Sequence, residues 1–148
     1  MPKILGDVTF SSDEIIAFTN IKRAQEGLPA LSYNPLLAQA ATAKAQDMLA
    51  FDYWSHNSPN GKTPWSFISA SGYKYVFAGE NLARDFTTAQ GAVDAWMNSP
   101  SHKDNLLDKN FKEIGVSVVS GKLTGKDGIL VVQMFGTGVS NSSAVADS

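Results

Sequence analysis

The chain has 148 residues, with 12 lysines and arginines against 14 aspartates and glutamates, two histidines and no cysteine. This length suits one domain with its own core, and a hydrophobic content of 43% argues against a disordered chain. A net charge of −2 argues against a nucleic-acid binder, which needs a basic surface. The missing cysteines exclude a disulfide framework, a thiol nucleophile and a cysteine-ligated metal. No apolar run approaches the roughly 20 residues of a membrane span.

Two helices are predicted in the first third of the chain. Ser11 and Glu14 have the spacing of a capping box, and Gly27 supplies a stop. Asn34 followed by Pro35 is typical of a second helix start. The residues at helical spacing after it are Leu36, Leu37, Ala40, Ala41, Lys44, Ala45, Met48 and Leu49. Alanine favours helix and lets a neighbouring element approach closely, so this helix is predicted to lie centrally in the core.

The middle of the chain alternates turns with short helices. Residues 56–61 contain Ser-Pro and Asn-Gly pairs, which form turns. Thr63 followed by Pro64 starts a short helix that Gly72 ends. Residues 78–83 fit either a short strand or an extended loop.

Two further helix starts precede the last third. Thr87 or Thr88 caps a helix that runs through Trp96. Ser99 followed by Pro100 then opens a short helix over residues 102–107.

The last third changes to the period of β-structure. Apolar and small residues alternate from Ile114 to Val118, which indicates a half-buried strand. Residues 129–135 form a second, nearly continuous apolar strand, and the polar residues 120–128 between them suit a hairpin loop. Helices followed by an antiparallel pair predict an α+β domain.

The predicted domain spans residues 11–138, between an N-terminal extension of residues 1–10 and a polar tail of residues 139–148. Residues 1–7 lack the sustained apolar core and the cleavage site that are typical of a signal peptide. The tail is small and polar, as in a linker.

Four short motifs together carry a family resemblance. They are HNSP at residues 56–59, GENLA at 79–83, WMNSPSH at 96–102 and IGV at 114–116. In this order they resemble the CAP superfamily of cysteine-rich secretory, antigen 5 and pathogenesis-related 1 proteins, over residues 12–136, in a bacterial-type form without cysteine. The resemblance implies an α–β–α sandwich with a small antiparallel sheet between helical layers.

The resemblance also implies a cleft lined by two histidines and two acidic residues. His56 matches the first histidine, Glu80 the acid of the GEN motif and His102 the second histidine. Ser99 stands where eukaryotic members often carry glutamate, so the cleft residues expected here are His56, Glu80, Ser99 and His102.

These residues could bind a metal ion, and Glu80 could also act in catalysis. Two imidazoles and one carboxylate can hold Zn²⁺ or another divalent ion, with His56 and His102 as ligands. Glu80 is the candidate catalytic residue, and it could instead only orient one of the histidines. His102 lies close to a helix start, which favours a neutral imidazole. The simpler interpretation is that each histidine makes only a local hydrogen bond.

The resemblance predicts an extracellular or cell-envelope binding module for a small-molecule, lipid, sterol or peptide ligand, and the net charge argues against a nucleic-acid partner. No set of nucleophile, base and orienting acid is recognisable in the sequence. A metal-dependent hydrolase with Glu80 as general base is the first alternative, and an envelope interaction module with a vestigial cleft is the second. The sequence leaves open the ligand, the oligomeric state and whether the domain is an enzyme.

Overall fold

The computed structural model describes residues 9–139, so most of the predicted N-terminal extension and tail lies outside the described residues. The described chain folds into five helices and one four-stranded sheet. In chain order the elements are α1 (Ser12–Gln25), β1 (Ser32–Tyr33), α2 (Pro35–Phe51), α3 (Pro64–Ala70), β2 (Tyr75–Arg84), α4 (Ala89–Met97), α5 (Pro100–Leu106), β3 (Glu113–Leu123) and β4 (Lys126–Gly138).

The sheet has the strand order β1-β3-β4-β2, so β2 lies at one edge. Strands β3 and β4 form a long antiparallel hairpin, and β2 pairs antiparallel with β4. The two-residue β1 adds a parallel pair to β3, which makes the sheet mixed. The sequence gives no sign of β1, because two residues are too few to show a period.

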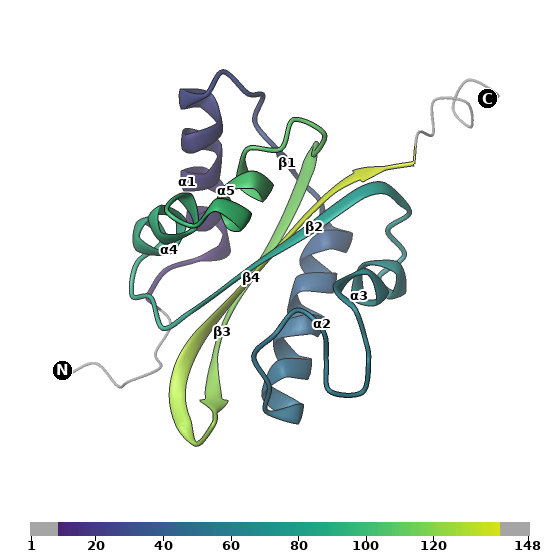
Figure 1. The fold of residues 1–148 in the computed structure, drawn as a ribbon, viewed down its shortest axis with the longest axis vertical. Coiled ribbons are helices and arrows are strands. Elements are labelled where there is room, and N and C mark those ends of the chain that lie inside the picture. The colour runs from purple at the N-terminus through teal and green to yellow at the C-terminus, as the bar shows by residue number, and fades with distance from the viewer. Residues whose placement is uncertain (1–8, 140–148) are drawn as a thin grey trace.

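Helices cover both faces of the sheet. Figure 1 shows α1, α4 and α5 on one side of the strands and α2 and α3 on the other. Strand β4 serves both layers, because successive side chains point to opposite faces. Leu130 and Val132 pack in the cluster with α2 and α3, whereas Ile129, Val131 and Phe135 pack in the cluster with α1, α4 and α5. The predicted α–β–α sandwich is therefore confirmed.

The local signals placed the helix starts correctly. Ser11 and Glu14 form the predicted capping box. The Asn34 side chain accepts hydrogen bonds from the backbone of Leu36 and Leu37 at the start of α2. Thr88, rather than Thr87, caps α4.

The predicted hairpin loop over residues 120–128 is wrong. Strand β3 continues to Leu123 and β4 begins at Lys126, leaving a two-residue turn. Both turn residues have positive φ, 52° at Thr124 and 79° at Gly125, as tight hairpin turns require. The end of this hairpin is polar because it is exposed, and exposed polar residues do not prevent a strand from continuing.

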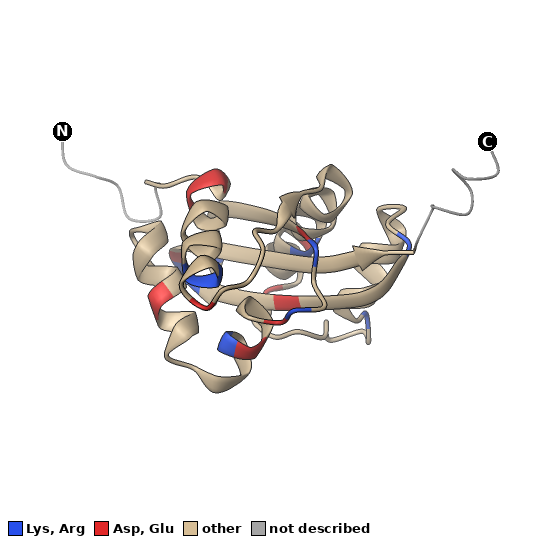
Figure 2. Cartoon of the chain, turned by 90° about the horizontal axis from the view of Figure 1, so that it is seen from above, with Lys and Arg blue, Asp and Glu red and all other residues tan. Residues whose placement is uncertain are grey.

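Residues 78–83, which fitted either a strand or a loop, lie within the ten-residue strand β2. Charged residues of both signs are interspersed on the helices and connections around the sheet (Figure 2). Within residues 9–139, no helix combines the length and the apolar composition that crossing a membrane requires.

Candidate functional site

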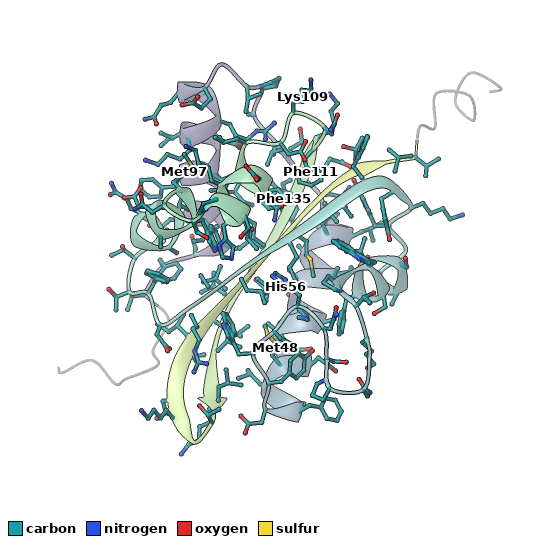
Figure 3. The ribbon with its side chains drawn as sticks, in the orientation of Figure 1. Met48, His56, Met97, Lys109, Phe111 and Phe135 are labelled. Carbon is teal, nitrogen blue, oxygen red and sulfur yellow. The ribbon has the colours of Figure 1, made fainter. Side chains whose placement is uncertain are left out.

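His56 and Glu80 form a direct pair at the edge of the sheet. His56 lies in the connection between α2 and α3, and its Nδ1 lies 2.6 Å from Oε1 of Glu80 on β2. The Glu80 side chain is only 1% exposed, whereas that of His56 is 56% exposed. Figure 3 shows His56 beside β2, in front of α2. A buried carboxylate thus fixes the orientation of an accessible imidazole. No residue within 9–139 hydrogen-bonds to its Nε2, which can therefore meet a ligand.

A buried lysine holds the backbone of the histidine in this pair. Lys44 on α2 is fully buried, and its Nζ donates a hydrogen bond to the backbone carbonyl of His56. The ammonium group also lies 5.2 Å from the ring centroid of Tyr53 and 5.5 Å from that of Phe67. Burial lowers the pKa of Lys44, and the charge of Glu80 partly opposes this effect. Lys44 therefore fixes the backbone that carries His56.

Ser99 and His102 form a second pair at the start of α5. Ser99 takes the predicted N-cap position, but its side chain makes no capping hydrogen bond. Its Oγ lies 2.8 Å from Nδ1 of His102 instead. Burial, and secondarily the charge of His56, lowers the pKa of His102. The neutral imidazole expected for His102 is thus favoured, chiefly by burial.

A buried amide network ties α5 to β2. Asn81 donates through Nδ2 to the carbonyl of His102 and to Oε1 of Gln133, both at 3.1 Å. Asn105 of α5 donates to the carbonyl of Glu80 at 3.1 Å and to Oδ1 of Asn81 at 3.0 Å. The two histidine pairs are therefore held on one framework of hydrogen bonds.

Gly79 completes the contact between β2 and its neighbours. A Cβ at this position would lie 2.7 Å from the ring of Phe111 and 3.3 Å from Oδ1 of Asn105, so no larger residue fits without displacement. The Phe111 ring stacks on Phe135 at 5.2 Å, and both are labelled in Figure 3. The GEN motif thus needs glycine here because the strand lies directly against a packed aromatic pair.

A pocket of about 280 Å³ lies beside β2. Its walls come from the His56 connection, α3, β2 and α5. The lining residues are His56, Asn57, Pro64, Trp65, Ala78, Gly79, Glu80 and Asn105. Two of the four expected cleft residues, His56 and Glu80, thus line one pocket. Ser99 and His102 are not among its lining residues and contact each other instead.

Three residues that the sequence analysis did not assign to this site contribute to it. Lys44 has a recognisable signal, since it is the one cation in the buried stripe of the second predicted helix, where a charge needs partners. Asn105 has no such signal, because only the fold brings it to Glu80. Trp65 follows the predicted helix start at Thr63–Pro64, and it is 40% exposed at the pocket, where an aromatic residue early in a short helix gives no sequence signal of its own.

The described residues do not assemble a complete metal site. Within residues 9–139, no three histidine, aspartate or glutamate side chains are grouped so that they could hold an ion. Catalytic zinc takes three protein ligands, whereas Oε1 of Glu80 is engaged with His56 and Nδ1 of His102 with Ser99. Metal binding by His56 and His102 stays a prediction, and we derive no chemical step from it.

Several known proteins are similar to this chain. The uncharacterized protein YkwD of Bacillus subtilis is 39% identical over 114 residues, which cover 77% of this chain and 44% of YkwD. An extracellular protein of Bacillus anthracis that contains an SCP domain has a solved structure with a TM-score of 0.72 and 29% identity, covering 84% of this chain and 39% of that one. An outer surface protein of Borrelia burgdorferi shares the fold, with a TM-score of 0.76 and 24% identity over 86% of this chain and 92% of its own.

The chain spans less than half the length of the curated relatives it matches. The model of the cysteine-rich secretory protein family, CAP, matches residues 16–135, a range that contains all four sequence motifs and both histidine pairs. This chain therefore belongs to the CAP family of cysteine-rich secretory proteins.

Proposed function

We propose that this CAP domain is an extracellular binding module whose ligand occupies the pocket beside His56 and Glu80. The observation that carries the proposal is the pairing of a buried carboxylate with an accessible imidazole at the pocket wall. An extracellular location is supported by the Bacillus anthracis relative, which is described as an extracellular protein.

The lining of the pocket suits binding. Pro64 and Trp65 supply apolar surface, while Asn57, Asn105 and His56 supply hydrogen-bonding groups. Pockets for organic ligands combine an apolar wall with a few fixed polar groups. At about 280 Å³ the pocket lies just below the range of roughly 300–1,000 Å³ that is typical for whole ligands. It would therefore hold one part of a lipid, sterol or peptide, while the rest of the ligand extends over the surface.

Glu80 supports recognition by fixing His56. Oε1 holds the His56 ring, and Oε2 is buried without a hydrogen-bond partner in the described residues. Because Oε2 is buried and the imidazole is exposed, a ligand meets His56 rather than this oxygen. This arrangement favours a ligand with a polar head that bonds to His56.

The proposal is tested by measuring binding of three separate ligands: palmitate, cholesterol and a displayed library of random octapeptides. We expect saturable binding of at least one of them in the presence of a chelator, weakened at least tenfold by His56→Ala. Gln46→Ala is the matched control, because Gln46 lines a different surface hollow on α2. It should leave binding unchanged.

Two results would contradict the proposal. None of the three ligands binds, or His56→Ala and Gln46→Ala affect binding equally. Turnover of an ester or peptide substrate that both the chelator and Glu80→Gln abolish would replace binding with metal-dependent hydrolysis.

A further inference from the structure

The outer edge of β2 is unpaired within residues 9–139, because β2 pairs there with β4 alone. The pairing register is unbroken from Phe77 to Arg84. Asp85, next along the chain, donates its N–H to the carbonyl of Ile129 on β4. In antiparallel pairs every second residue exchanges hydrogen bonds with the partner strand. The odd-numbered residues therefore bond to β4, and the even-numbered residues turn their N–H and C=O groups outward.

Side chains cover part of this outward edge. The carbonyl of Leu82 accepts a hydrogen bond from Nε1 of Trp96 at 2.9 Å, and that of Glu80 accepts one from Asn105 at 3.1 Å. Ala78 is the next outward-facing residue, and no side chain within residues 9–139 bonds to its N–H or C=O. Side chains thus bond to the outward carbonyls of β2 as far as Glu80. At Ala78 the outward N–H and C=O are both available to a ligand.

The open edge coincides with the pocket. Ala78, Gly79 and Glu80 all line it, so one side of the pocket is the backbone of a strand. Pro64 and Trp65 of α3 form an apolar wall beside this backbone. Further along β2, Val76 and Phe77 are also exposed, with exposed fractions of 58% and 46%.

We infer that the ligand of this site is an extended peptide that adds a short strand to β2 at Ala78. This inference rests on the proposed binding function and names the class of ligand. Ala78 would donate its N–H to a peptide carbonyl and accept an N–H from the same peptide residue, as an edge strand does with an added strand.

The same geometry sets the side-chain preference of the peptide. Side chains of directly paired residues lie on the same face of a sheet. Leu82, which has the same parity as Ala78, packs in the cluster with α2 and α3. The peptide residue opposite Ala78 therefore directs its side chain to the α3 side, against Pro64 and Trp65, and is expected to be apolar.

A lipid or sterol fits this edge less well. Its hydrocarbon would remove water from the Ala78 N–H and C=O without replacing the lost hydrogen bonds, which is unfavourable. The peptide strand is also short, because Asn105 already occupies the next outward carbonyl, at Glu80. One or two residues of backbone pairing, and an apolar side chain at the pocket, would define the ligand.

The test selects the displayed octapeptide library on the wild-type protein, on Ala78→Pro and on Ala78→Ser. Proline removes the N–H and is tolerated at sheet edges, whereas serine keeps the N–H. We expect wild type and Ala78→Ser to enrich peptides with an apolar residue. The best synthetic peptide should bind Ala78→Pro at least tenfold more weakly. Far-UV circular dichroism and the thermal midpoint check the fold of each variant.

Amide hydrogen exchange of the wild-type complex gives a readout that needs no substitution. We expect exchange at Ala78 to slow at least tenfold when the selected peptide is bound. If palmitate or cholesterol binds in a His56-dependent way and no peptide is enriched, the peptide inference fails while the binding function stands. A peptide that binds without slowing exchange at Ala78 would contradict docking on β2. If none of the three ligands binds, the peptide inference and the proposed binding function both fail.

Discussion

The fully buried Lys44 donates a hydrogen bond to the backbone carbonyl of the accessible His56, not to its ring. The imidazole is fixed separately by Glu80. The position of His56 thus depends on two residues that come from different elements, α2 and β2. Each of them acts on a different part of His56, so substitutions can separate their effects.

Lys44→Met should lower the free energy of unfolding by about 2 kcal/mol, the typical cost of leaving a partly buried carbonyl without its donor. Methionine is unbranched and one heavy atom shorter than lysine, so it keeps the apolar stem near Tyr53 and Phe67 and removes the donor. Urea unfolding measures the loss. Lys62→Met is the control, because Lys62 is half exposed and its ion pair with Asp47 is 3.6 Å long, worth less than about 1 kcal/mol. Equal losses in the two variants would contradict the supporting role of Lys44.

His102 should make the protein less stable as the pH falls. Its native pKa lies below the ordinary histidine value because of burial and the charge of His56. The unfolded state therefore takes up a proton first, near pH 6.5, and stability decreases as the pH falls through that value. Unfolding at pH 8 and pH 5 should show a smaller decrease in His102→Gln than in wild type. An unchanged pH dependence in the variant would exclude this effect.

The two helices that begin with an Asn-Pro or a Ser-Pro pair differ in their caps. In α2, Oδ1 of Asn34 accepts two backbone hydrogen bonds, and its Nδ2 donates to Glu113 at 3.1 Å. In α5, the Ser99 hydroxyl is turned toward His102. Similar sequence signals thus serve a structural purpose at one helix and support the site at the other.

Asn34→Ala should therefore cost about 1–2 kcal/mol of stability through the lost cap. Ser99→Ala loses no capping bond, only the hydrogen bond to His102, and should cost about 1 kcal/mol or less. Thermal or urea unfolding of both variants checks this difference. A larger loss for Ser99→Ala than for Asn34→Ala would show that the Ser99 hydroxyl matters more for the fold than its contacts indicate.

Elements were predictable from the sequence where their signals are local. Helix starts were found because a capping residue and its proline lie next to each other, as at Asn34 and Thr63. The length of the β3–β4 hairpin was missed because its end is exposed and polar, so no apolar alternation marks it. The family motifs identified His56 and Glu80, but the contact of Asn105 with Glu80 exists only once α5 packs on β2.

The whole molecule depends on one strand that is buried on both faces. Adjacent residues of β4, Ile129 and Leu130, belong to the two different hydrophobic clusters on either side of the sheet. Because the same backbone carries both clusters, the two helical layers cannot separate from the sheet independently without exposing β4. The layers should therefore unfold together.

Ile129→Ala and Leu130→Ala should each lower the free energy of unfolding by about 2–5 kcal/mol. Fluorescence, to which Trp96 in the α4 layer and Trp65 on α3 both contribute, should give the same midpoint as circular dichroism in each variant. Two separate transitions in either variant would show that the layers are independent.

The most direct test of the proposed pocket is an amide NMR titration of the wild-type protein with whichever of palmitate, cholesterol or the selected octapeptide binds. We predict saturable shifts at Asn57, Trp65, Ala78, Gly79 and Asn105, which surround the His56–Glu80 pair. Shifts concentrated instead on the outer hollow of α2, at Tyr33, Gln39 and Gln46, or no shifts with any of the three ligands, would contradict it.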